Sequence, residues 1–193
     1  RLITTGIGNM LNSFTELQPV LMSMLISMVF SFIIISPLST VAIAMAIGLS
    51  GIAAGSASIG IAATEAVLLI GTSQVNRLGI PLSIFFGGVK MMMPNMVKYP
   101  VIMVPIFITA ALSGIASGII GIGGTKESAG FGFIGMVGLI NAFKFMHVDS
   151  VWLSLLLIIV AFFVVPFLIA WILDLLLRKV IHLYRNDIFK FMG

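Results

Sequence analysis

Long apolar stretches without charge alternate with short polar breaks along this chain. The longest uncharged stretches cover residues 17–64, 99–125 and 150–173. Each has room for a helix of about 20 residues that crosses a bilayer, and the first has room for two. Backbone groups in lipid must be satisfied within the chain, and the alternation of a membrane strand is absent. The pattern therefore predicts an all-α integral membrane protein.

About five spanning helices are predicted from this pattern. They cover residues 18–36, 39–55, 60–74, 100–122 and 151–173. The second and third are read either as two short spans or as one span plus a broken helix, because small residues crowd the middle of 38–73. Trp152 and Trp171 lie near the two ends of the last span, as interfacial anchors do.

Two further apolar segments are predicted to be re-entrant or broken rather than spanning. Residues 79–89 are too few to cross a bilayer. Residues 129–143 carry four glycines, which disfavour a straight helix. Irregular backbone at membrane depth is tolerated where it is buried in protein or lines a cavity.

A set of identical residues recurs at one constant spacing. The first copy consists of Pro37, Val41, Ile43, Leu49, Ser50, Gly51, Ile52, Ala53 and Gly55. The second consists of Pro100, Val104, Ile106, Leu112, Ser113, Gly114, Ile115, Ala116 and Gly118. Each copy continues to a threonine followed by a glutamate, which are Thr64 and Glu65, and Thr125 and Glu127. We therefore expect an internal parallel repeat near 37–66 and 100–129, an arrangement typical of transporters.

Composition supports the membrane assignment and excludes several functions. The chain is 60% hydrophobic and 8% charged, against about 25% charged in soluble domains. No cysteine is present, so disulfides, thiolate metal sites and cysteine nucleophiles are excluded. The net charge of +4 is scattered over short loops, which does not indicate nucleic-acid binding. The chain opens with Arg1, so we expect one membrane transport domain over 1–193 that is the later part of a longer protein.

The distribution of lysine and arginine predicts the orientation. Basic residues cluster in 178–193, so this amphipathic tail is predicted to be cytoplasmic. If 129–146 enters and leaves on one side, Lys126 and Lys144 lie outside the cell. We expect a multi-pass membrane protein whose C-terminus is cytoplasmic.

Ionisable residues inside a membrane domain are costly, so a functional role is the default hypothesis for Glu65. Its carboxylate could accept hydrogen bonds from sugar hydroxyls or carry a proton. The alternative is an interfacial loop glutamate between two short spans.

The other substrate-binding candidates rest on the repeat or on amide chemistry. Thr125 and Glu127 are the counterparts of Thr64 and Glu65, although a Gly-Gly turn with adjacent charges is also typical of an exposed loop. Amides suit neutral polyols because they both donate and accept hydrogen bonds. The remaining candidates are Asn76, Lys90, Asn95 and Asn141. Lys90 also fits a cytoplasmic positive charge.

No catalytic constellation, metal site or cofactor motif is predicted. His147 and His182 have no neighbouring pattern of ligands. The glycine-rich run 130–135 matches a dinucleotide fingerprint by letters, but no strand precedes it and no acid follows at the required spacing. The chain is therefore not predicted to be an enzyme.

Two runs resemble a known family. Residues 79–95, GIPLSIFFGGVKMMMPN, and 124–138, GTKESAGFGFIGMVG, are similar to enzyme IIC, the membrane subunit of the bacterial phosphoenolpyruvate-dependent sugar phosphotransferase system. More narrowly, they resemble its stand-alone IIC-like branch. The resemblance implies a homodimeric permease of the bacterial inner (plasma) membrane, with a sugar site between re-entrant hairpins and a mobile transport domain. It also implies soluble phosphotransferase subunits as partners. It implies that Glu65, Glu127, Asn95 and Lys90 are the nearest counterparts of the sugar-binding groups.

Three functions remain open from the sequence. The first is a transport domain that binds a small polar solute, expected to be a sugar, and passes it by alternating access. The second is a proton- or ion-coupled carrier or channel for another solute. The third is a membrane regulator or scaffold without a transport cycle.

Overall fold

A computed structural model describes residues 2–146 and 150–192, and no strand occurs in them. The α-helices are α1 (Leu2–Leu17), α2 (Pro19–Ile35), α3 (Thr40–Ile47), α4 (Gly51–Ser73), α5 (Gly79–Phe85), α6 (Met93–Lys98), α7 (Met103–Ile120), α8 (Val137–Phe145), α9 (Val151–Ile159) and α10 (Val165–Leu175). Short 3₁₀ turns cover Gly88–Met92, Pro100–Ile102, Ser128–Gly130, Ile134–Met136 and Asn186–Phe189. Two π-helical turns, Val160–Val164 and Leu176–Val180, follow α9 and α10. The predicted all-α class is confirmed.

Three helices in the described residues are long and apolar enough to cross a membrane. They are Gly51–Ser73, Pro100–Ile120 and Val151–Val180. The last two agree with the predicted spans at 100–122 and 151–173. The apolar helix α2, which lies in the predicted span 18–36, is shorter at 17 residues.

The predicted region 38–73 folds as one span plus a short broken helix, so the reading as two short spans is wrong. Helix α3 ends at Gly48, whose φ of 70° is left-handed, and Gly51 at φ 57° begins α4. These backbone angles favour glycine, and they set the break before residue 51. From there α4 runs for 23 residues through the expected junction near 55–60.

The two copies of the sequence repeat fold differently, which corrects the expectation of one duplicated structural unit. In the first copy, Leu49 and Ser50 lie in the break between α3 and α4. In the second copy, the matching Leu112 and Ser113 lie inside the continuous helix α7. The repeat is therefore a repeat of sequence, and backbone geometry differs at its most similar block.

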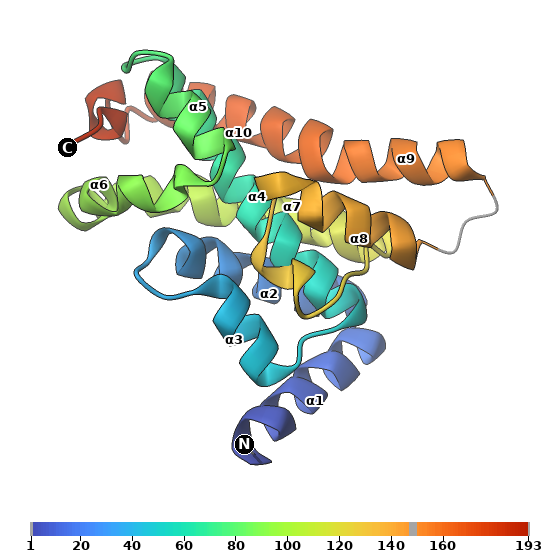
Figure 1. Cartoon of the computed structure of the whole chain (residues 1–193). Coiled ribbons are helices and arrows are strands. Elements are labelled where there is room, and N and C mark those ends of the chain that lie inside the picture. Colours follow the sequence, from blue (N-terminus) through green and yellow to red (C-terminus); the bar gives the residue numbers. More distant parts are fainter. Residues whose placement is uncertain (1, 147–149, 193) are drawn as a thin grey trace.

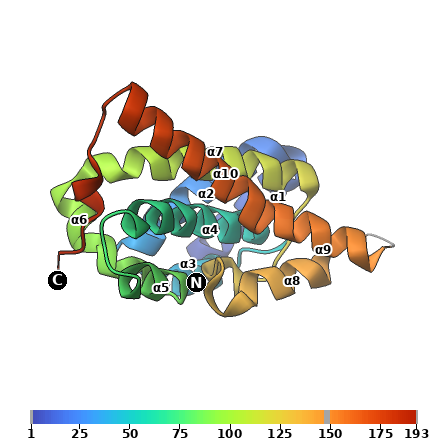
Figure 2. The ribbon, with the colours of Figure 1, turned by 90° about the horizontal axis from the view of Figure 1, so that it is seen from above.

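Helix α4 forms the centre of the molecule. Figure 2 shows it in the middle, with α7 and α10 on one side and α5 and α8 on the other. Its small side chains allow this because neighbouring backbones approach closely. A Cβ on Gly60 would overlap the Ser27 carbonyl of α2, and one on Gly55 would overlap the Ile122 carbonyl. Packing of this kind fixes α4 against its neighbours.

The helix that contains α9 and α10 lies at the edge of the bundle (Figure 1). Trp152 and Trp171 are exposed on it, as are Leu156 and Leu168. Large apolar side chains along such a helix suit contact with lipid.

The predicted segments 79–89 and 129–143 contain only short helical pieces, α5 and α8 with 3₁₀ turns beside them. None of these pieces is long enough to span a bilayer. Whether they are re-entrant stays a prediction.

Residues 184–191, which we call the C-terminal strap, fold back against the ends of α4 and α6. Tyr184, Ile188 and Phe189 are buried, whereas Arg185 and Lys190 are exposed. Asn95 Nδ2 donates to the carbonyls of Ile188 at 2.7 Å and of Lys190 at 2.8 Å. Asn76 donates to the Phe189 carbonyl and accepts from the Phe191 N–H, both at 2.8 Å.

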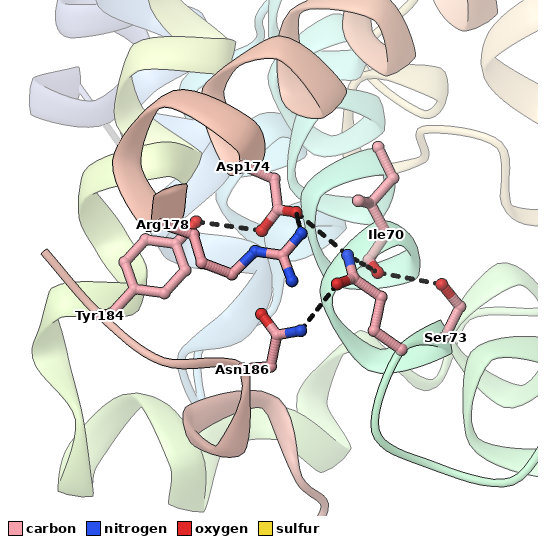
Figure 3. A network of polar contacts seen from close by, with 7 residues as sticks. Ile70, Ser73, Asp174, Arg178, Tyr184 and Asn186 are labelled. Atoms are coloured by element: carbon pink, nitrogen blue, oxygen red, sulfur yellow. Dashed lines mark hydrogen bonds and ion pairs between the residues drawn. The ribbon is translucent and has the colours of Figure 1, made fainter. Parts of the chain in front are cut away.

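A polar network joins the strap to α4 and α10 (Figure 3). Arg178 pairs with Asp174 at 2.9 Å, and Gln74 donates to the same carboxylate oxygen at 3.0 Å. Asn186 donates to Gln74 at 2.7 Å. Tyr184 donates to Asp174 at 3.4 Å, and burial together with the Asp174 charge raises the pKa of Tyr184. The network fixes the end of α4 against α10.

The close contact of Gly71 with the strap generates a stability prediction. A Cβ at Gly71 would lie 2.6 Å from ring carbons of the buried Phe189. Gly71→Ala is therefore expected to displace the strap and to lower the free energy of unfolding by about 1–3 kcal/mol. Thermal unfolding in detergent micelles, followed by tryptophan fluorescence, measures the change.

Gly79→Ala is the matched control, because no heavy atom lies within 4 Å of a Cβ built there. It should leave the unfolding temperature unchanged or raise it slightly, since alanine favours a helix. Equal unfolding temperatures for Gly71→Ala and the parent protein would show that Phe189 is not held as described.

Candidate functional site

Glu65 lies in the interior of α4 with its side chain fully buried. The Phe133 backbone N–H donates to its Oε2 at 2.8 Å. Its Oε1 is buried and has no hydrogen-bond partner in the described part of the chain. The alternative reading of Glu65 as an interfacial loop residue is therefore wrong, because the helix is continuous on both sides of it.

The glycine-rich loop 130–138 covers this carboxylate. A Cβ on Gly132 would overlap Glu65 Oε2 and would lie 2.7 Å from the Ala62 nitrogen. The close approach of loop backbone to α4 therefore requires glycine. Sequence reasoning noticed the glycines of this segment but did not place Gly132 or Phe133 in the site. The four glycines of 129–143 were the available signal, and they were interpreted only as disfavouring a straight helix.

Side chains of α3 and α4 hold the stretch that leads into this loop. Thr40 Oγ1 donates to the Gly130 carbonyl at 3.0 Å, and Ser58 Oγ donates to the Ser128 carbonyl at 2.7 Å. Gly51 and Gly124 exchange two backbone hydrogen bonds of 3.0 Å each. These bonds satisfy backbone groups that a helix would otherwise satisfy internally.

Aromatic rings cover the other side of the loop. The Phe133 ring stacks on Phe163 with a centroid separation of 4.6 Å and an interplanar angle of 7°. Phe167 lies 5.7 Å from the same ring. Phe163 belongs to the π-helical turn Val160–Val164. Phe133 therefore binds Glu65 through its backbone N–H and packs through its ring against the helix that contains α9 and α10.

The structure does not bring Thr125 and Glu127 together with Glu65. They lie in a turn in which Ser128 Oγ accepts from the Thr125 N–H at 2.9 Å. The side chains of Lys126 and Glu127 are 54% and 57% exposed. Hydrogen bonds from its own backbone N–H and from the Thr125 side chain hold the pKa of Glu127 below its usual value. The turn matches the exposed-loop alternative.

Lys90 contacts the end of α2. Its Nζ donates to the carbonyls of Ser36 and Leu38 at 2.5 Å each. Carbonyls at a helix C-terminus lack intrahelical donors, and a cation there is favourable. Partial burial lowers the pKa of Lys90 from its usual value. Lys90 thereby ties the segment after α5 to the α2–α3 connection.

The remaining candidates lie apart from Glu65. Asn76 and Asn95 donate to the C-terminal strap, as described above. Asn141 Nδ2 donates to the Val137 carbonyl within α8 at 3.0 Å. The predicted set of site residues as a whole stays a prediction. Within it, Glu65 Oε1 and Asn95 Oδ1 are the buried side-chain atoms that have no hydrogen-bond partner in the described residues, and Glu65 is the one that is a carboxylate.

The arrangement at Glu65 can accept one further hydrogen bond or bind one cation. None of the ion pairs in the described part of the chain involves Glu65. No group of three or more His, Cys, Asp or Glu residues able to hold a metal occurs in the described residues. A carboxylate oxygen without a donor is an expensive feature of a protein interior.

Comparison with known proteins assigns the chain to a family. Residues 1–191 match the family model described as Phosphotransferase system, EIIC. No curated protein and no solved structure matched the chain. The match spans nearly the whole chain, and it agrees with the resemblance carried by residues 79–95 and 124–138. Together with the apolar helices, it indicates a bacterial plasma-membrane permease component whose substrate is a sugar and whose partners are soluble phosphotransferase subunits. The chain belongs to the EIIC family, the sugar-transporting membrane component of the phosphotransferase system.

Proposed function

We propose that this chain binds a sugar at Glu65 and passes it across the membrane by alternating access. The observation that carries the proposal is the unpartnered Oε1 of a fully buried carboxylate. Buried polar groups in proteins are nearly always hydrogen-bonded, so an orphan acceptor calls for an explanation. A sugar hydroxyl can serve this oxygen, because a hydroxyl both donates and accepts hydrogen bonds.

Access to Glu65 requires a conformational change, because its side chain has no exposed surface. The loop 130–138 is the segment that covers it. The loop meets α4 through the Phe133 N–H, the close approach of Gly132, and the Phe133 side chain, which belongs to the same core cluster as Ile59 and Ala62. We propose that this loop leaves α4 when the site opens to one side of the membrane. Interrupted helices around a buried site are typical of carriers that work in this way.

The proposal gives the other predicted residues indirect roles. Lys90 and the turn that holds Thr125 and Glu127 fix the chain on either side of the site, and Asn141 lies on α8 directly after the loop. Asn76 and Asn95 would bind a sugar only after release of the strap. Glu65 is therefore the residue on which a test of the site should rest.

A second candidate is a proton- or ion-coupled carrier. The observation that favours it is that Glu65 has one hydrogen-bond donor and no basic partner among the described residues. A lone carboxylate in an apolar interior is a suitable carrier of a proton or a cation. The coupling ion would then take the place that we assign to a sugar hydroxyl.

The assembly is also part of the proposal. The exposed apolar face of Val151–Val180 is long enough to pair with a second copy across the membrane. We propose a homodimer, in keeping with the family resemblance, and a C-terminus on the cytoplasmic side.

The uptake of labelled sugars by proteoliposomes that contain the full-length protein tests the proposed function. Glu65→Gln keeps an acceptor for Phe133 but replaces the other oxygen with an amide donor. We expect the efficiency of uptake (kcat/KM) to fall about ten- to hundredfold, the cost of leaving a buried polar group without its partner. Glu16→Gln, on the exposed face of α1, is the matched control and should leave uptake unchanged.

The same experiment separates the alternatives. Uptake that requires a pH gradient, and that loses this requirement in Glu65→Gln, would favour the proton-coupled carrier. Unchanged uptake by Glu65→Gln would remove Glu65 from the site. No uptake of any sugar under either condition would favour a regulator or scaffold.

Orientation can be tested with single cysteines, because this chain contains none. The side chain of Arg185 in the strap is 91% exposed, and that of Lys126 is 54% exposed. A membrane-impermeant thiol reagent added to intact cells is expected to label Lys126→Cys. Arg185→Cys should be labelled only after the membrane is permeabilised, because basic residues favour the cytoplasmic side. Labelling of Arg185→Cys in intact cells would reverse the orientation.

A further inference from the structure

The Phe133 peptide is held from two directions at once. Its N–H points to Glu65 Oε2 at 2.8 Å, and its ring stacks on Phe163 at 4.6 Å. We propose that Phe163 is a positioning residue for the site: its ring fixes the Phe133 peptide so that one carboxylate oxygen is occupied and the other is left for the ligand. Only the statement that the second carboxylate oxygen is left for a ligand rests on the proposed function.

The loop conformation needs stabilising contacts from other elements, because its own backbone hydrogen bonds stabilise it little. Gly135 and Met136 have φ values of 60° and 59°. A non-glycine residue in the left-handed region costs free energy and persists when surrounding structure holds it there. Two hydrogen bonds close the turn: the Met136 N–H donates to the Phe133 carbonyl at 2.9 Å, and the Val137 N–H donates to the Ile134 carbonyl. Phe133 is therefore the anchor of the turn, and whatever holds its ring holds the peptide.

The ring contact is specific in its geometry. The Phe133 and Phe163 planes lie at 7° to each other, and those of Phe133 and Phe167 at 16°. Aromatic pairs at such separations stabilise more than their buried area alone predicts. Phe162 is fully buried beside Phe163, but it lies near Gly138 and makes no ring stack with Phe133 among the described contacts.

The sequence explains why Phe163 faces the loop. Pro166 cannot donate a backbone hydrogen bond, and the helix accommodates it with a π-helical turn in which the Val165 N–H donates to Val160. A π turn inserts one residue into the helical repeat and so changes the direction of the side chains near it. Pro166 thus favours the π-helical turn, and the turn directs Phe163 toward the loop. The position of the Phe133 peptide therefore depends on a helix that forms no described hydrogen bond with Glu65.

Hydrogen exchange of the Phe133 amide in the full-length protein, measured by NMR in nanodiscs, tests this inference without reference to transport. We expect slow exchange in the parent protein and exchange about three- to tenfold faster in Phe163→Leu, as the stack is lost. Phe163→Tyr keeps the stack and should retain slow exchange. Phe162→Leu, which removes a comparable buried ring from the same turn, should leave Phe133 exchange unchanged.

Equal exchange rates in Phe163→Leu and Phe162→Leu would overturn the inference. If Phe163→Leu does not fold, Phe133→Leu removes the same stack from the loop side and must give the same acceleration at residue 133. Amide exchange at residue 133 that is as slow in Phe133→Leu as in the parent protein would also overturn the inference.

Uptake then connects the positioning role to the ligand. Phe163→Leu should raise the KM for the sugar in the parent background and have no further effect on KM in Glu65→Gln, because it acts through the same carboxylate. Additive effects would mean that Phe163 acts elsewhere. Absence of uptake in the parent protein would contradict the proposed function, whereas the exchange result would still decide the role of Phe163.

Discussion

Every polar backbone group inside a lipid-embedded chain must find its partner within the protein, and most of this structure follows from that constraint. The chain breaks its helices repeatedly, at Gly48, before Gly88 and from Gly121 to Val137. Each break frees carbonyls and N–H groups that a helix would satisfy. Polar side chains fill these places, since Lys90 binds the end of α2 while Thr40 and Ser58 bind the glycine-rich connection.

Glu65 differs from these side chains in the direction of its hydrogen bonding. The others are donors that satisfy carbonyls, whereas Glu65 is an acceptor that receives one N–H and retains a free oxygen. A donor side chain at a helix break has a structural role, because it binds a backbone carbonyl that the broken helix leaves without a partner. A buried acceptor with spare capacity does not. Asn95 Oδ1 is a second such acceptor, but the Asn95 amide also donates to the strap, whereas none of the described contacts of Glu65 satisfies a backbone carbonyl.

This distinction also explains which predictions succeeded. The gaps between charges identified the helices at 100–122 and 151–173, because length and apolarity decide whether a helix can span. Residue type alone could not show whether Asn76 and Asn95 bind a ligand, since an amide can bind either a polyol or a backbone carbonyl outside a helix. Their use by the strap depends on residues 184–191 folding back, a long-range contact that no local pattern encodes.

The sequence repeat misled for a related reason. Gly51 and Gly114 occupy matching positions, but Gly51 has a left-handed φ of 57° at a helix start. Gly114 lies within α7, where a Cβ would overlap Ser27 Oγ of α2. The same letter serves a backbone turn in one copy and helix packing in the other, because glycine permits both uses. Identity of sequence between two copies therefore did not imply identity of fold.

The contacts around α4 indicate where the molecule can move. Its first residue is paired with Gly124, and its last turn is tied to α10 and the strap through Gln74 and Phe189. Between these points, the α2 backbone lies too close for a Cβ on Gly60, and the Ile122 carbonyl lies too close for a Cβ on Gly55. A helix fixed at both ends and packed along its length is a poor moving part. Loop 130–138 meets α4 through one hydrogen bond to Glu65, the close approach of Gly132 and the packing of Phe133 in the cluster of Ile59 and Ala62. These contacts are fewer than those that hold α4, so we propose that the loop moves while α4 stays in place.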